Sequence, residues 1–174
     1  MSELRFPDVR WGSPDGWFRR AFQPAAIAFL ESRLGGWIHR RLRWLDLVLL
    51  RATGGRVSMF GPSGIYVLVL TTTGRKTGNL HSVPLVYVPH EGGALVLGSN
   101  YGRLQHPAWS GNLLAIPKAT VEVGGQKFPV DAEHITGAQF EDLFRHFLAI
   151  GENFETYRER SQRDLRMFAL RRVG

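Results

Sequence analysis

The sequence predicts an α+β domain built on a small, mainly antiparallel β-barrel, with helices before it and around it. Three observations lead to this fold class. Strands joined by short turns fill the middle of the chain, helical patterns lie mostly outside that region, and five or six hairpin-linked strands favour a barrel, which leaves no strand edge exposed. At 174 residues the chain has the length of about one domain. We divide it into an N-terminal arm with amphipathic helices (1–56) and a barrel domain (57–174).

The N-terminal part predicts an irregular arm followed by two helices. Pro24 suits the first turn of a helix that runs to about Leu34, because the N–H that proline lacks is not needed there. Gly35-Gly36 is expected to break this helix. A second helix is expected over 37–51, where apolar residues recur at helical spacing, and Gly54-Gly55 is expected to end it. Its apolar side is expected to hold Ile38, Leu42, Leu45 and Leu49, flanked by Trp37, Trp44 and Val48, and its polar side His39, Arg40, Arg43 and Asp46.

The barrel strands are predicted from β-branched runs and turn residues. They are expected over 65–72, 80–88, 94–99, 120–130 (a hairpin turning at Gly124-Gly125) and 165–172. Pro84 marks an edge position or a bulge in the second strand, because proline donates no ladder hydrogen bond. Helices are expected over 107–116, 138–150 and 152–163.

Composition excludes several classes of function. The chain is 44% hydrophobic and 21% charged, which argues against disorder, and no apolar run approaches the ~18–20 residues of a spanning helix. The N-terminus lacks the apolar core of a signal peptide, so we expect a cytoplasmic protein. Without cysteine there can be no disulfide, zinc–thiolate site or thiol nucleophile, and the six scattered histidines predict no metal site.

A net charge of +7 permits nucleic acid, an anionic membrane or an anionic small molecule as partner. The excess lies in the first two thirds of the chain, while residues 131–174 carry seven arginines against eight acids. No nucleic-acid motif accompanies the basic residues, so we expect no nucleic-acid partner. The arginine face of helix 37–51 could rest on an anionic bilayer or simply face solvent.

The first unusual stretch is TTTGRKTGNLHSVPL over 71–85. Hydroxyls and two cations, Arg75 and Lys76, cluster around Gly74 and Gly78. A turn with free N–H groups and two cations can bind an anion. An ordinary polar hairpin turn with solvated charges explains the same residues.

The second unusual stretch, GSNYGRLQHPAWSGNL over 98–113, leads from a strand into a helix. Gly98 and Gly102 permit close approach of a flat ligand to the backbone, and Trp109 and Asn112 share a helix face. The alternative is a plain loop with Trp109 in the core. Phe154 and Tyr157, three apart on a helix, either line a cleft or pack inside.

Together these stretches resemble the deazaflavin-dependent nitroreductase family. The order TTTGRKTG, Pro84-Leu85, a Gly-Ser-Asn loop and HPAWSGNLLAIP (106–117), followed by a V-x-V hairpin, matches the family pattern over roughly residues 36–172. The resemblance implies a split β-barrel of the flavin-reductase or FMN-binding kind. It also implies coenzyme F420, a 5-deazaflavin with a phosphodiester and a polyglutamate tail, and hydride transfer to a quinone, nitroaromatic or activated enone.

The resemblance also implies site residues. Cofactor contacts are expected from Thr73, Arg75, Lys76, Thr77, Gly78, Pro84, Leu85, Gly98, Ser99, Asn100, Gly102, Pro107, Ala108, Trp109 and Asn112. Ser99 is expected to hydrogen-bond the acceptor, Tyr157 to wall its pocket and Tyr101 to contact the ring or the acceptor. Val86 and Phe154 stand with Tyr157 where family members that reduce nitroimidazoles carry tyrosines, and Asn100-Tyr101-Gly102 replaces a Gly-Gly pair.

Other functions remain open on the sequence alone. FMN could replace F420, since its single phosphate would also suit Arg75 and Lys76. A non-catalytic carrier of a deazaflavin or another anionic ligand fits the same motifs, and a peripheral membrane adaptor would bind lipid without the cofactor. The reductase itself could rest at the inner face of the cell membrane through helix 37–51. The oligomeric state is expected to be monomer or homodimer.

Overall fold

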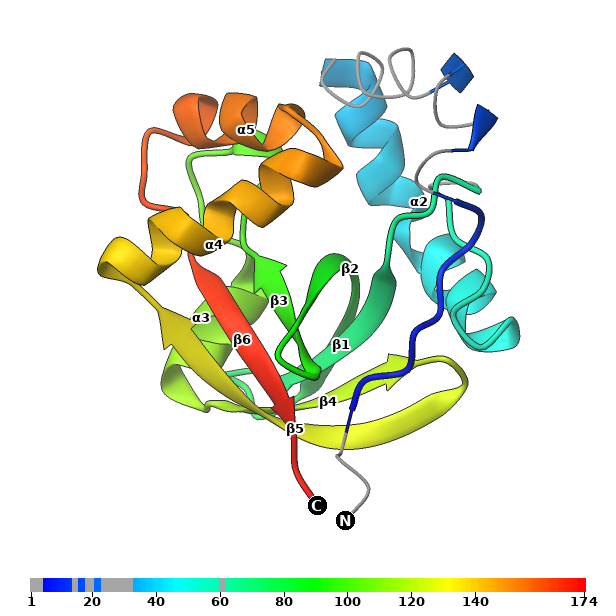
Figure 1. The fold of residues 1–174 in the computed structure, drawn as a ribbon. Coiled ribbons are helices and arrows are strands. Elements are labelled where there is room, and N and C mark those ends of the chain that lie inside the picture. Colours follow the sequence, from blue (N-terminus) through cyan, green and yellow to red (C-terminus); the bar gives the residue numbers. More distant parts are fainter. Residues whose placement is uncertain (1–4, 14–15, 18–20, 23–32, 60–61) are drawn as a thin grey trace.

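Within the part of the chain that the computed structural model describes, residues 5–13, 16–17, 21–22, 33–59 and 62–174, six antiparallel strands close into a barrel (Figure 1). The strand order around the barrel is β1-β2-β3-β6-β5-β4. The strands are β1 (Val67–Thr73), β2 (Leu80–His90), β3 (Gly93–Leu97), β4 (Lys118–Val123), β5 (Gln126–Ile135) and β6 (Met167–Arg172). The predicted antiparallel barrel is confirmed, with strand boundaries within a few residues of those expected, except that β5 continues to Ile135.

The helices surround the barrel. They are α2 (Arg33–Ala52), α3 (Ala108–Ala115), α4 (Gly137–Ile150) and α5 (Asn153–Ser161), with a short 3₁₀ turn, η1 (Asn100–Gly102). The three C-terminal helices confirm the expected segments. In Figure 1, α4 and α5 lie on one side of the barrel opening and α2 on the other.

The expected helix break at Gly35-Gly36 is wrong, because α2 runs through both glycines. The expected helix from Pro24 lies largely outside the described residues. The expected stop at Gly54-Gly55 is confirmed: both residues have positive φ, and the Gly55 N–H donates to the Leu50 carbonyl at 2.7 Å. No described helix is long and apolar enough to cross a membrane.

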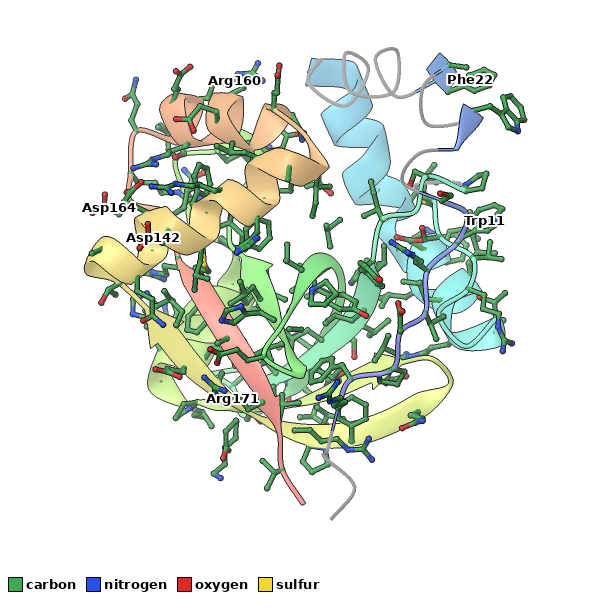
Figure 2. All side chains as sticks on the ribbon, viewed as in Figure 1. Trp11, Phe22, Asp142, Arg160, Asp164 and Arg171 are labelled. Carbon is green, nitrogen blue, oxygen red and sulfur yellow. The ribbon has the colours of Figure 1, made fainter. Side chains whose placement is uncertain are left out.

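Two hydrophobic clusters hold the fold together. One fills the barrel with side chains from every strand, including Leu68, Val96, Val121 and Phe168, and Phe6 of the N-terminal arm packs against it. The other lies between the barrel and α4/α5, where Phe144 and Phe147 meet Met167. Charged side chains such as Asp142 and Arg160 lie on the outer side of these helices (Figure 2).

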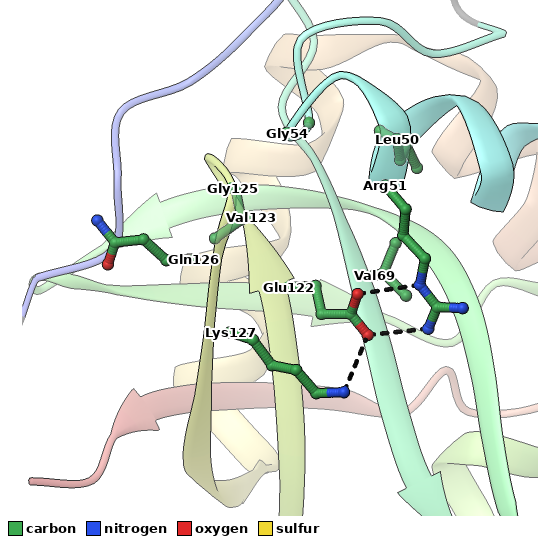
Figure 3. A pocket seen from close by; sticks show the side chains of 10 residues that line it. Leu50, Arg51, Gly54, Val69, Glu122, Val123, Gly125, Gln126 and Lys127 are labelled. Carbon is green, nitrogen blue, oxygen red and sulfur yellow. Dashed lines mark hydrogen bonds and ion pairs between the residues drawn. The ribbon is translucent and has the colours of Figure 1, made fainter.

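An ion-pair cluster fixes the C-terminal end of α2 on the barrel (Figure 3). Arg51 donates from Nε and Nη2 to the two carboxylate oxygens of Glu122 on β4, at 2.9 and 2.8 Å, and from Nη2 to Ser82 Oγ at 3.2 Å. Lys127 Nζ lies 3.7 Å from Glu122 Oε1. Beneath the cluster, Leu50 packs on Val67 and Val69 of β1.

The predicted faces of α2 are partly wrong. Trp44 and Val48, expected beside the apolar stripe, are 62% and 54% exposed, whereas Asp46, expected on the polar side, is fully buried. The cause is the docking of α2 through Leu50 and Arg51. Residues four apart share a helix face, so burial of Leu50 buries Asp46 as well. The side chains expected at 37–40 and at 43 lie outside what the structure describes.

Candidate functional site

A hydrogen-bonded clamp places the 74–79 turn against α3. Asn112 on α3 is buried; its Nδ2 donates to Thr72 Oγ1 at 3.1 Å, and its Oδ1 accepts from the Arg75 N–H at 3.1 Å. The Arg75 guanidinium lies over Gly111, where a Cβ would stand 2.9 Å from Arg75 Cζ. The stretches 71–85 and 98–113 therefore meet at two points: the side-chain amide of Asn112 and the backbone of Gly111.

The expectation of free N–H groups in this turn is wrong for three positions. The N–H groups of Thr77 and Gly78 both donate to the Gly74 carbonyl, at 3.2 and 2.7 Å, and the Arg75 N–H donates to Asn112. A tight turn uses its own amides to close, so its capacity for anions rests on the Arg75 and Lys76 side chains.

An open groove of about 700 Å³ runs past this turn. Its lining includes Arg75, Lys76 and Arg103, all exposed and none with an ion-pair partner among the described residues, and no lining residue is acidic. Three such cations with no carboxylate beside them can bind an anionic ligand. The lining residues are Gly74, Arg75, Lys76, Thr77, Leu80, His81, Ser82, Val83, Asn100, Arg103, His106, Pro107, Ala108, Trp109 and Asn112.

A second cavity, of about 150 Å³, lies between β2, η1, α4 and α5. Its aromatic rings form a series: Tyr101 meets Tyr157 at 6.1 Å between centroids, Tyr157 meets Phe154 at 6.1 Å, and Phe154 meets Phe147 at 5.5 Å. All three contacts are edge-to-face, the geometry that aromatic pairs favour. The lining residues are Asp46, Val83, Pro84, Leu85, Val86, Leu97, Ser99, Asn100, Tyr101, Pro107, Trp109, Phe147, Asn153, Phe154 and Tyr157.

The two cavities are neighbours. They share four lining residues, Val83, Asn100, Pro107 and Trp109. β2 passes along both: residues 80–86 pair with β1, and pairing with β3 begins only at Tyr87. In the described chain, the other edge of 80–86 therefore has no strand partner, and Pro84 stands on this half-paired segment, as the edge prediction required. An unpaired strand edge offers backbone groups to a flat polar ring.

Arg163 braces the loop that separates β3 from α3. Its guanidinium donates to the carbonyls of Gly98 (3.1 Å), Ser99 (3.2 Å) and Arg103 (3.1 Å), and its Nη1 lies 2.9 Å from His106 Nδ1. Arginine can only donate, so His106 accepts through Nδ1 and is neutral with its proton on Nε2. Burial, then the Arg163 and Arg166 charges, lowers the pKa of His106.

The same loop holds two non-glycine residues in the left-handed region, Asn100 (φ 48°) and Tyr101 (φ 56°). Such residues cost about 1–2 kcal/mol each, and the surrounding contacts must offset this. Asn100 Nδ2 donates to the Gln105 carbonyl at 2.8 Å, and Arg163 holds the flanking carbonyls. The strained turn aims Tyr101 at Tyr157 across the second cavity.

Most of the expected site residues lie on these two cavities, but four do not. Thr73 pairs with Leu80 in the β1–β2 ladder, and Gly78 closes the turn. A Cβ on Gly98 would stand 3.2 Å from the Arg166 carbonyl, and one on Gly102 would stand 3.1 Å from Tyr157 Cα. Both glycines thus approach protein segments. The other expected residues divide between the groove and the second cavity.

Sequence reasoning missed Asp46, Arg103, His106, Gly111 and Arg163. One signal was available for Asp46, since it interrupts the apolar run WLDLVLL over 44–50. Arg163 lies in a stretch of alternating charges. Nothing in the sequence distinguishes an arginine that hydrogen-bonds a loop from one that faces solvent.

A family model and a curated relative both point to F420H(2)-dependent quinone reductases. The family model of F420H(2)-dependent quinone reductases matches residues 47–171. The F420H(2)-dependent quinone reductase Rv1261c of Mycobacterium tuberculosis is 28% identical over 144 residues, covering 78% of this chain and 96% of the relative.

Two solved structures are similar in fold. An F420-H2 dependent reductase (FDR-A) has 27% identity and a TM-score of 0.54, covering 60% of this chain and 92% of its own. A structure described as a domain-swapped dimer has a TM-score of 0.56 at 23% identity, covering 75% of this chain and 97% of its own.

Proposed function

Since the chain belongs to the F420H(2)-dependent quinone reductase family, we propose that the cation-lined groove holds coenzyme F420 and that the neighbouring aromatic cavity holds the acceptor. The protein is an F420H2-dependent oxidoreductase that acts on quinones. We assign the two cavities to cofactor and acceptor because they adjoin each other. The groove with unpaired cations opens beside the largely apolar cavity, and Trp109 and Pro107 line both.

The residues present fit the cofactor. The groove supplies Arg75, Lys76 and Arg103 for the phosphodiester and the glutamates, since charge-assisted hydrogen bonds are the stronger kind. The half-paired edge of β2 would flank the planar deazaflavin: residues 80–83 line the groove, and Pro84-Leu85 continue the same edge into the aromatic cavity. The ring would therefore lie at the junction of the two cavities, beside Trp109. When bound, the cofactor supplies the hydride, and the protein positions it and stabilises the charge that develops on the acceptor.

The aromatic cavity suits a flat acceptor of low polarity. Tyr101, Phe154 and Tyr157 offer ring edges and faces, and Val86 offers aliphatic surface. Ser99, which also lines the cavity, is the side chain we propose to hydrogen-bond the acceptor. Unchanged turnover of quinone and nitro acceptors in Ser99→Ala would remove that role.

We propose quinones as the preferred acceptors, ahead of nitroaromatics and activated enones. A panel of the three, each reduced under the same conditions, ranks them. Quinone turnover should exceed the others, and a preference for nitroaromatics would reverse the assignment.

The experiment that tests the cofactor is a titration with F420 and, separately, with FMN, followed by tryptophan fluorescence. Trp109 lies at the junction of the two cavities and should be quenched by a bound ring. F420 should bind more tightly than FMN, because its tail can engage all three cations. Tighter binding of FMN would contradict the proposal.

We also propose that the cytoplasmic enzyme can rest on an anionic membrane through α2. Trp44 and Val48 are exposed and lie one helical turn apart, with the exposed Arg41 nearby, which supports an interfacial contact. Trp44→Glu should reduce flotation with anionic liposomes and leave the fold intact. Leu114→Glu, which also replaces an exposed apolar side chain but lies on α3, should leave flotation unchanged. Equal flotation of wild type and Trp44→Glu would refute the role of this helix.

A further inference from the structure

Asp46 is a fully buried carboxyl on α2 that lines the aromatic cavity. Its Oδ1 accepts a hydrogen bond from the Met59 N–H at 2.8 Å. Its Oδ2 is buried and has no hydrogen-bond partner among the described residues. Buried polar atoms are nearly always paired, so an unpaired carboxyl oxygen in a largely apolar cavity of about 150 Å³ needs an explanation.

The surroundings of Asp46 favour a protonated carboxyl. Burial raises its pKa, and the hydrogen bond from Met59 opposes this more weakly. The titratable side chains that share its cavity in the described chain are Tyr101 and Tyr157, and neither is a basic group that would hold the carboxyl ionised. Arg51, on the same helix, is bound to Glu122. Because Oδ1 accepts from Met59, the proton belongs on Oδ2, the oxygen without a partner.

Quinone reduction needs a proton donor in this cavity. A hydride converts a quinone to the hydroquinone monoanion, and the anionic oxygen must then take up a proton. The other polar side chains on the lining are hydroxyls and amides, which are much weaker acids than a carboxylic acid. A general acid poised near the reaction pH is the usual solution.

We propose that Asp46 is the general acid that protonates the acceptor; this rests on the proposed quinone reductase function. The quinone gains a hydride from the reduced cofactor and becomes a monoanion. The Oδ2–H bond of Asp46 breaks, and its proton forms an O–H bond on the anionic oxygen, which completes the hydroquinone. The resulting carboxylate regains a proton from solvent, equal to the proton that the oxidised cofactor releases.

Asp46→Asn tests the role with little change in shape, because the amide oxygen still accepts from Met59. Quinone turnover should fall about 100-fold, while F420 affinity by tryptophan quenching stays at the wild-type value. The loss should be smaller for chlorinated quinones, whose hydroquinone anions are weaker bases and need the acid less. A structural role would reduce turnover of both kinds of quinone equally.

A second readout needs no cofactor. Since the folded chain keeps this proton to higher pH than the unfolded chain, whose carboxyl has a pKa near 3.8, wild-type stability should fall relative to Asp46→Asn as pH rises above that value. Thermal unfolding of the two proteins between about pH 4 and about pH 8 measures this. A difference in Tm that does not change with pH would overturn the buried, protonated carboxyl.

The outcomes separate the two proposals. A wild type that binds F420 but reduces no quinone refutes the proposed acceptor and, with it, the acid. A wild type that reduces quinones together with an equally active Asp46→Asn refutes the acid alone. A uniform loss across all quinones also refutes it.

Discussion

Replacing Gly111 by alanine should stabilise the protein and weaken cofactor binding at the same time. Gly111 lies inside α3, and its missing side chain leaves the space that the Arg75 guanidinium occupies. A Cβ there would stand 2.9 Å from Arg75 Cζ, closer than real Cβ contacts allow. The flexible arginine, not the helix, is the part that moves.

The two effects have different sizes and opposite signs. Alanine in place of glycine inside a helix contributes about 1 kcal/mol to stability. A hydrogen bond to a charged group is worth about 1.5–3 kcal/mol, so displacing Arg75 from the groove should weaken binding by about 10- to 150-fold. Arg75→Ala sets the upper limit of this loss, because it removes the guanidinium altogether.

Fluorescence titration with two ligands separates the anionic tail from the ring. Gly111→Ala should weaken binding of F420 but leave unchanged the binding of the ribityl deazaflavin that lacks the phosphodiester and glutamates. Leu114→Ala, at an exposed position of the same helix, is the matched control. Equal losses for both ligands, or wild-type affinity for F420, would refute the assignment of Arg75 to the tail.

Three further substitutions test how the site is held. Arg163→Lys should lower the free energy of unfolding by about 2 kcal/mol, because an ammonium cannot reach all of the loop carbonyls, and should raise the acceptor KM more than it lowers kcat; thermal unfolding and steady-state kinetics measure both. Asn112→Ala should cost about 2 kcal/mol in chemical denaturation and weaken F420 binding, since it breaks the clamp on the turn. Glu122→Gln should cost up to about 1 kcal/mol at pH 7. Arg51 lowers the pKa of Glu122, so this contribution is present above the unfolded carboxyl pKa of about 4.5 and is lost as pH falls through the folded pKa. Wild type and variant should therefore converge in acid.

The sequence was a good guide to the barrel because the strand signals there are local. Hairpin turns such as Gly124-Gly125 and β-branched runs locate the strands, although β5 continues to Ile135, beyond the predicted end at residue 130. α2 was predicted less well, because the face it buries depends on a distant ion pair with Glu122, 71 positions along the chain. No periodicity in the helix itself contains that contact.

In the candidate site too, residues placed by local sequence were predicted better than residues placed by contacts between distant segments. Most of the residues expected from the two motifs line one of the two cavities, because motif order carries them to neighbouring turns, although Arg103, His106 and Gly111 within the second motif were missed. Arg163 and Asp46 were missed, since each acts on a segment that only the closed barrel brings near: Arg163 on the loop at 98–106, and Asp46 on the cavity under α5. The prediction of free N–H groups in the 74–79 turn was wrong for the opposite reason. The N–H groups of Thr77 and Gly78 hydrogen-bond within the turn itself.

α2 carries three features of the molecule: the ion pair with Glu122, the buried Asp46 and the exposed apolar side chains of Trp44 and Val48. Arg51 bonds to β4 and β2, which fixes the helix on the barrel. That position buries Asp46 in the aromatic cavity and leaves Trp44 and Val48 exposed. A helix that presents an acid inward and apolar side chains outward would let a quinone dissolved in a membrane enter beside the helix that protonates it. On the proposals made above, the N-terminal segment is therefore part of the catalytic cavity, and a variant that lacks it should lose activity even with the barrel intact.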